Sequence, residues 1–203
     1  MNAALLGEGP SDRCLLPILR WLLGRCTPQE VSVDWVDTTR LPAARTLSEK
    51  VRHTLLAQPC DLLFIHRDSD NQPVTWRYDE IRDAAGQQTH VGVVPIRMME
   101  AWLLLDESAI RAAAGRVSGR EPLRLPSPSR VEDVANPKHV LREALLAAHA
   151  STGRRKDRFD PGAALYRVAD LVEDWEPLRQ LSAFQRLEAD TLQALNALHI
   201  PTS

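Results

Sequence analysis

The sequence predicts an α/β fold: a mostly parallel, four-stranded sheet flanked by helices, followed by a helical C-terminal extension. Short apolar runs near residues 3–6, 31–37, 62–65 and 90–96 alternate with amphipathic segments of helical period. This alternation is typical of a parallel sheet that is covered on both faces. The extension is predicted because no further strand pattern follows Ile96.

The four predicted strands are indicated by different residue patterns. The first, residues 3–6, stops at a Gly-Glu-Gly-Pro turn, and the second, residues 31–37, is rich in Val and Trp. The third, Leu62 to Ile65, is continuously apolar, which favours a strand buried on both faces. The fourth, residues 90–96, contains three valines and an isoleucine, which fit a pleated surface well.

Helices are expected between these strands. Pro10 suits the first turn of a helix, a leucine-rich stripe follows it, and Gly24 is a plausible end cap. Asp12, near the start, fits the helix dipole, and it also completes a Glu-Gly-x-x-Asp pattern with Glu8 that would give it a role in the site. An amphipathic helix over residues 46–57 ends at a Gln-Pro pair, and a short helix is expected over 76–85.

The predicted division places an α/β domain at residues 1–106 and a helical extension at 107–203. An apolar helix over 98–105 closes the first domain. A loop at 115–130 is rich in Pro, Ser, Gly and Arg, and residues 153–160 form a charged turn. The helices expected in the extension cover 107–114, 136–150, 161–175 and 177–199.

Composition excludes several classes of protein. The 203 residues suffice for a hydrophobic core, and a formal net charge of −2 gives no global basic field. Cys14, Cys26 and Cys60 are odd in number and form no Cys-x-x-Cys pair, so neither a disulfide framework nor a structural zinc site is expected. The N-terminus lacks the basic and long apolar regions of a signal peptide, and no run has the length of a membrane span. The expected location is a reducing cytoplasm.

Acidic residues follow three of the predicted strands. Glu8 follows the first strand, Asp68 and Asp70 follow the third, and Glu100 follows the fourth. Parallel sheets place their sites beyond the carboxyl ends of the strands, so these acids are expected along one edge. Clustered carboxylates repel each other unless a cation lies between them, and Mg²⁺ prefers oxygen ligands. The pattern therefore indicates a Mg²⁺ or Mn²⁺ site for phosphoryl transfer, although a polar turn would look similar.

The Glu-Gly pair at Glu8, followed later by Asp68-Ser69-Asp70, resembles the TOPRIM domain, the catalytic module of topoisomerases, bacterial primases and related nucleases. The stretch from Pro95 to Asp106, with Glu100-Ala101-Trp102, is similar to an element of a bacterial TOPRIM-like family of unknown function, as is Asn136-Pro137-Lys138. The resemblance covers the first half of the chain well and the second half thinly. It implies a TOPRIM sheet, which is Rossmann-like.

The resemblance also implies roles. Glu8 would serve as general acid or base or as a metal ligand, Asp68 and Asp70 would hold the metal, and Glu100 would be an additional acid. A nuclease acting on DNA or RNA is the activity implied, with a defence-system effector as its setting. Neither a topoisomerase tyrosine arrangement nor an ATPase phosphate loop is present, so any ATPase partner would be a separate chain.

Basic residues are the expected substrate contacts. Arg67 precedes Asp68 and could touch phosphate or neutralise the acids, while His66 before it is expected to be a core histidine. Lys138, Arg154 and Lys156 are further candidates for phosphate contacts, although each also fits an ordinary solvated position.

Two other functions stay open at this point. One is a non-catalytic subunit that binds nucleotide or a partner chain with the same fold. The other is a haloacid dehalogenase-like phosphatase, which also uses Asp-x-Asp. Its nucleophile normally follows the first strand of the domain, and Gln72 stands where Thr or Val is common, so this alternative ranks low.

Overall fold

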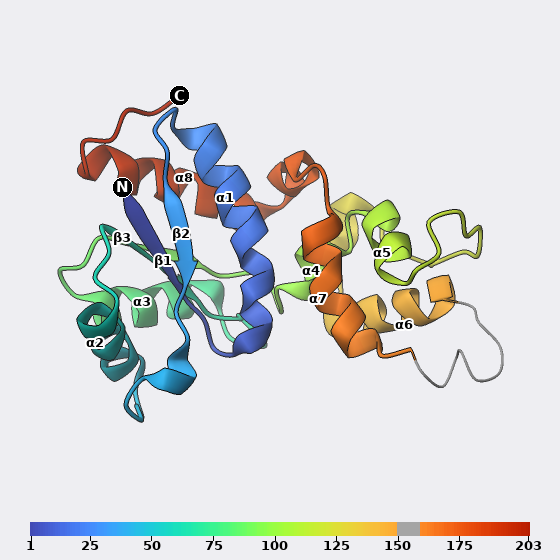
Figure 1. Ribbon diagram of the computed structural model, residues 1–203, viewed down its shortest axis with the longest axis horizontal. Helices are drawn as coiled ribbons and strands as arrows, with labels where there is room; N and C mark the ends of the chain where they lie inside the picture. The colour runs from blue at the N-terminus through green and yellow to red at the C-terminus, as the bar shows by residue number, and fades with distance from the viewer. Residues whose placement is uncertain (150–158) are drawn as a thin grey trace. The chain divides into compact units, whose positions relative to one another are not determined.

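The computed structural model describes residues 1–149 and 159–203, and it divides the chain into two compact units (Figure 1). Residues 1–95 together with 182–203 form the sheet unit, and residues 96–181 form the helical unit. The division differs from the predicted boundary at residue 106. The last helix of the chain belongs to the sheet unit, because its apolar side packs there and completes the cover of the sheet.

The sheet has four strands, all parallel, in the order β2-β1-β3-β4. Their bounds are β1 Asn2–Leu6, β2 Ser32–Trp35, β3 Leu62–His66 and β4 His90–Val93. The prediction of an α/β fold with a parallel four-stranded sheet is confirmed. Strands β1 and β3 occupy the centre, and for this reason their runs are continuously apolar and buried.

Helices cover both faces of this sheet. Helices α2 (Leu47–Ala57) and α3 (Val74–Ala85) contact one another and share a core with the side chains of Ala4 and Ile65. Neighbouring strand residues such as Leu5 and Phe64 point to the opposite face, since side chains alternate along a strand. Helices α1 (Leu15–Cys26) and α8 (Ser182–Ala197) pack together on that face, as Figure 1 shows.

The first helix differs from its prediction at both ends. A 3₁₀ helix, η1 (Pro10–Cys14), precedes α1, and α1 continues through Gly24 to Cys26. Thr27 caps it, with its N–H donating to the carbonyl of Leu23. A glycine inside a helix costs about 1 kcal/mol relative to alanine. The burial of the leucines of α1 outweighs that cost. A second short 3₁₀ helix, η2 (Thr38–Arg40), follows β2.

The helical unit contains no strand among its described residues. Its elements are α4 (Glu100–Leu103), α5 (Glu107–Ala113), η3 (Pro128–Asp133), α6 (Pro137–His149), α7 (Pro161–Leu171) and η5 (Glu176–Gln180). Helices α5, α6 and α7 pack on one another. The segment predicted as a loop has no helix or strand until η3 begins at Pro128. Residues 153–158 of the predicted charged turn lie outside the described residues.

Local signals set the starts of two of these helices. The Asn136 side chain accepts a hydrogen bond from the N–H of His139, and the Asp160 side chain accepts from Gly162 and Ala163. Both are helix N-caps. Within the described part of the chain, no helix combines the length and the apolar character that a membrane crossing requires.

Candidate functional site

Glu8 and Asp68 meet at the carboxyl edge of the sheet. Each follows one of the two central strands, β1 and β3, which are hydrogen-bonded neighbours. The backbone N–H of Asp68 donates to Oε2 of Glu8 over 3.3 Å. The two acids therefore lie on the same edge, where parallel sheets commonly place their sites.

Two arginines tie this edge to helix α3. Nη1 of Arg67 lies 2.7 Å from Oε1 of Glu8, and Nε of Arg67 lies 3.3 Å from Oε2 of Glu80 on α3. Arg77, also on α3, places Nη1 3.0 Å from the same Glu80 oxygen and donates from Nε to the carbonyl of Asp68 over 2.9 Å. The arginines thus hold the acids in a continuous network of charges.

Asp70 enters this network from a left-handed backbone position. Its Oδ2 lies 3.5 Å from Nη2 of Arg77, and half of its side chain is exposed. Its φ is +51°, a region that aspartate and asparagine enter more readily than most residues. Arg77 therefore links the backbone carbonyl of Asp68 to the side chain of Asp70. The left-handed backbone at Asp70 means that this segment is not an extended strand with both carboxylates on one face.

A buried histidine joins Asp68 to a third acid. Nδ1 of His66, the last residue of β3, lies 2.9 Å from Oδ2 of Asp12 in η1, and Nε2 of His66 lies 3.2 Å from Oδ1 of Asp68. The first contact is a hydrogen bond, and the second is an ion-pair contact whose geometry falls outside that of a hydrogen bond. The side chains of His66 and Asp12 are only 1% and 7% exposed.

The pKa values of this pair move apart. Burial by itself lowers the pKa of His66, but its contacts with Asp12 and Asp68, and their charges, outweigh burial and raise it to about 9. Burial by itself raises the pKa of Asp12. The hydrogen bond and the charge of His66, together with the N–H groups of Glu8 and Gly9, outweigh burial and leave this pKa below its usual value. An imidazolium between carboxylates is the favoured state at neutral pH.

Gly7 is required by this arrangement. A Cβ at Gly7 would lie 2.6 Å from Oδ2 of Asp12 and 2.8 Å from the ring of Trp35, whereas a Cβ at Gly9 would meet nothing within 4 Å. The absence of a side chain at Gly7 lets the Asp12 carboxylate reach the N–H groups of Glu8 and Gly9, at 2.7 and 3.3 Å.

We expect Gly7→Ala to destabilise the fold by about 1–3 kcal/mol, the usual cost of overpacking a dense site. For a chain of this size that loss lowers Tm by about 2–4 °C per kcal/mol. Gly9→Ala is the matched control, because Gly9 has an extended backbone with φ −157° and open space around it. Thermal unfolding of both variants decides the matter, and equal Tm values would contradict the role assigned to Gly7.

The other predicted site residues lie in the helical unit or outside the described residues. Glu100 is buried at the start of α4, and Nζ of Lys138 on α6 lies 3.7 Å from its Oε1. Lys138 is therefore engaged with an acid of its own unit. Arg154 and Lys156 fall within residues 150–158, outside the described part of the chain.

Four residues complete the site beside the predicted acids: Asp12, His66, Arg77 and Glu80. His66 is buried, as the sequence predicts, and it also pairs with Asp12 behind Asp68. The spacing Glu8-Gly9-x-x-Asp12 was the available signal. Nothing in the sequence marks Arg77 and Glu80, because they reach the edge only through the packing of α3.

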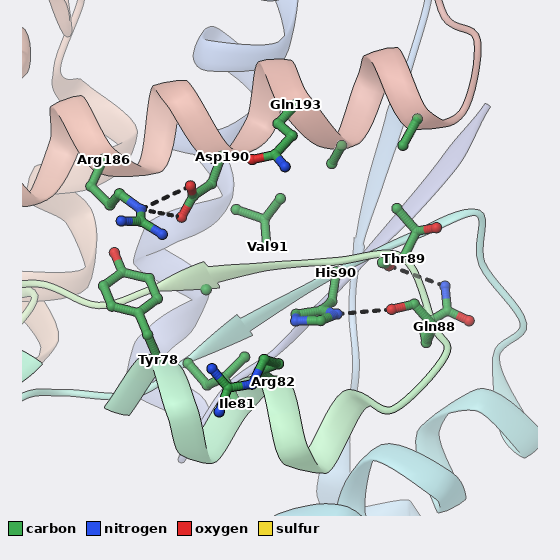
Figure 2. A pocket seen from close by; sticks show the side chains of 13 residues that line it. Tyr78, Ile81, Arg82, Gln88, Thr89, His90, Val91, Arg186, Asp190 and Gln193 are labelled. Atoms are coloured by element: carbon green, nitrogen blue, oxygen red, sulfur yellow. Dashed lines mark hydrogen bonds and ion pairs between the residues drawn. The ribbon is translucent and has the colours of Figure 1, made fainter. Parts of the chain in front are cut away.

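Two cavities flank α3 in the sheet unit. One, of about 460 Å³, lies between α3, β4 and α8 and is lined by Tyr78, Val91, Arg186 and Asp190 (Figure 2). Burial and then the charge of Asp190 raise the pKa of Tyr78 to about 12, although Arg186 opposes this. The other, of about 570 Å³, lies between α2 and α3, and Arg67 and Glu80 are on its wall. Only the second shares residues with the acidic edge.

The acidic edge offers the ligand chemistry of a hard cation. The contacts given above join five carboxylates (Glu8, Asp12, Asp68, Asp70 and Glu80) to three cations (His66, Arg67 and Arg77). Carboxylate oxygens suit Mg²⁺ or Mn²⁺. No group of three or more His, Cys, Asp or Glu side chains is already arranged as a metal site in the described residues. An ion bound at Glu8, Asp68 and Asp70 would therefore have to compete with Arg67, His66 and Arg77, respectively.

The chain was compared with known proteins by family, by sequence and by structure. No family model, no curated protein and no solved structure matches it.

Proposed function

We propose that this protein is a Mg²⁺- or Mn²⁺-dependent phosphodiester hydrolase, a nuclease of TOPRIM type acting on DNA or RNA. The observation that carries the proposal is the contact between Glu8 and Asp68, at the ends of two neighbouring central strands. Both acids follow strands that are hydrogen-bonded neighbours, and carboxylate oxygens are the ligands that a hard divalent cation prefers.

Glu8, Asp68 and Asp70 would hold the ion. A bound ion would neutralise phosphate charge and help to activate water. Glu8, which is partly exposed, would accept the proton of the attacking water as its oxygen bonds to phosphorus. The bond from phosphorus to the leaving sugar oxygen would then break, and that oxygen would take up a proton from solvent water. Arg67, at 2.7 Å from Glu8, is placed to contact a non-bridging phosphate oxygen.

Asp12 and His66 act from behind this group. Both are buried, so they would touch neither substrate nor water. The charged imidazole fixes the position of Asp68 through the 3.2 Å contact with its Oδ1. They are positioning residues, comparable to the outer partners that orient metal-binding side chains.

A second candidate function is a non-catalytic subunit that binds nucleotide or a partner chain. The observation that favours it is the engagement of Glu8, Asp70 and Glu80 by arginines. These ion pairs reduce the repulsion between carboxylates without any metal. The two candidates differ in whether a divalent ion binds at this edge.

Thermal unfolding with added Mg²⁺ or Mn²⁺ separates them. An ion at 100 times its Kd stabilises the folded state by about 2.7 kcal/mol, which corresponds to a Tm rise of about 5–11 °C for a chain of this length. We expect that rise in the wild type and its loss in the double variant Asp68→Asn, Asp70→Asn. Asp34→Asn, which changes an exposed acid on β2, should keep it. Equal ion-induced shifts in the wild type and the double variant would contradict a metal site here.

A further inference from the structure

The cavity between α2 and α3 adjoins the acidic edge through a shared side chain. Arg67 lines the cavity and also contacts Glu8 at 2.7 Å. The volume of about 570 Å³ falls within the range of about 300–1,000 Å³ that is usual for ligand sites. A cavity of this size accepts one nucleotide but not a base-paired helix.

The cations of this cavity are unequally engaged. Its three acids are already paired with arginines. Asp79 and Asp83 form ion pairs with Arg82 at 2.7 and 3.2 Å. Glu80 forms ion pairs with Arg67 and Arg77. Arg45 and Lys50, at the start of α2, form no ion pair with any described residue. They are the positive charges that remain for an anionic ligand.

The helix terminus itself is already capped. The Thr46 hydroxyl accepts from the N–H of Glu49, and the Glu49 carboxylate accepts from the N–H groups of Arg45 and Thr46. A bound anion would therefore be held by side chains, not by the backbone of α2.

Trp76 supplies an aromatic surface on the wall formed by α3. It is 49% exposed, which is unusual for so large an apolar side chain. The guanidinium of the neighbouring Arg77 lies 5.0 Å from its ring centroid and helps to fix the indole. An exposed aromatic ring beside unpaired cations is the combination that binds single-stranded nucleic acid, through stacking on bases and contacts to phosphates.

We infer that this cavity holds one nucleotide of a single-stranded DNA or RNA, with its base on Trp76 and its phosphate on Arg45 and Lys50. The strand then continues past Arg67 to Glu8 and Asp68. The inference rests on the proposed function for what happens at those acids. The binding itself requires neither metal nor cleavage, because the proposed contacts are made by Arg45, Lys50 and the indole of Trp76, while the acids on the wall are paired with arginines.

The experiment measures binding without catalysis. Fluorescence anisotropy of labelled twelve-nucleotide oligothymidylate and oligouridylate in EDTA gives Kd at several salt concentrations, and a labelled duplex of the same length serves for comparison. We expect the wild type to bind the single strands more tightly than the duplex. The two oligonucleotides distinguish DNA from RNA.

Two sets of variants locate the site. Trp76→Ala should weaken binding about 5- to 150-fold, the loss that corresponds to removing one stacked base, and Trp76→Phe should restore much of it. The double variant Arg45→Ala, Lys50→Ala should reduce the slope of log K against log salt by about 0.7, since the two cations hold one phosphate and each neutralised phosphate contributes about 0.7 for single strands. Controls are Arg52→Ala, an exposed cation of α2 outside the cavity, and Tyr166→Ala, an exposed aromatic of the helical unit.

The outcomes separate this inference from the proposed function. Wild-type protein that binds no single strand, or that prefers the duplex, overturns the inference, as does unchanged binding in the Trp76→Ala and Arg45→Ala, Lys50→Ala variants. If these variants cleave the substrate and bind single strands as tightly as the wild type, the inference is overturned and the proposed hydrolase function remains. Site-dependent binding by a protein that cleaves nothing supports the inference and removes only the proposed hydrolase.

Discussion

Asp68→Asn is expected to lower the rate of phosphodiester cleavage by about 10²–10³-fold, the loss typical when one preorganised charge-stabilising group is removed. The substitution keeps the shape of the side chain and the backbone N–H that donates to Glu8, and it removes the negative charge beside His66. Initial rates on single- and double-stranded DNA and RNA with Mg²⁺ or Mn²⁺ measure the effect, and EDTA should abolish activity. Asp70→Asn should act in the same direction.

Asparagine is the better replacement at residue 70 for a structural reason. The left-handed backbone of Asp70 would strain alanine, and asparagine adopts it readily, so a loss of activity can be assigned to the charge. Asp34→Asn, on the exposed side of β2, should cleave at the wild-type rate. Wild-type protein that cleaves none of the four substrates with either ion would favour the binding-subunit alternative. Unaltered rates in both site variants would remove these acids from the mechanism.

Asp12→Ala is expected to destabilise the fold by about 3–5 kcal/mol, because it leaves the buried imidazole of His66 without its main partner. For a chain of this length the loss lowers Tm by about 6–20 °C, at about 2–4 °C per kcal/mol. Asp12 also satisfies the N–H groups of Glu8 and Gly9, which would lose their acceptor. Urea unfolding of the variant measures the change in free energy. Asp12→Asn retains an acceptor and should lose less.

The same pair sets a pH dependence of stability. The pKa of His66 is raised in the folded state to about 9, so its contribution is fully present below the unfolded pKa of about 6.5 and is lost as pH rises through 9. The pKa of Asp12 is lowered in the folded state, so its contribution is present above its unfolded value of 3.8 and is lost as pH falls below that value. The free-energy difference between wild type and Asp12→Asn should therefore be largest between about pH 4 and 6.5 and should shrink by pH 9.5. A difference that grows with pH would contradict a charged His66.

The sequence by itself determined the sheet and its acidic edge. Continuous apolar runs such as Leu62 to Ile65 can only be buried on both faces, and that requirement predicts parallel strands with helices on either side. Once the strands are parallel, Glu8 and Asp68 must emerge at the same edge, since the chain direction is shared. Both conclusions follow from local patterns, which a single sequence contains.

Tertiary structure alone decided which side chains surround those acids. Asp12 and His66 are 54 positions apart, and their 2.9 Å hydrogen bond depends on the fit of η1 against the end of β3, with no side chain at Gly7 to prevent it. Arg77, Glu80 and Trp76 reach the edge or its cavity because α3 packs beside α2. Helix α8 joins the sheet unit for a similar reason, because its apolar face completes a core whose other members end at residue 95. Such contacts link residues that are distant in sequence, and no pattern along the chain specifies them.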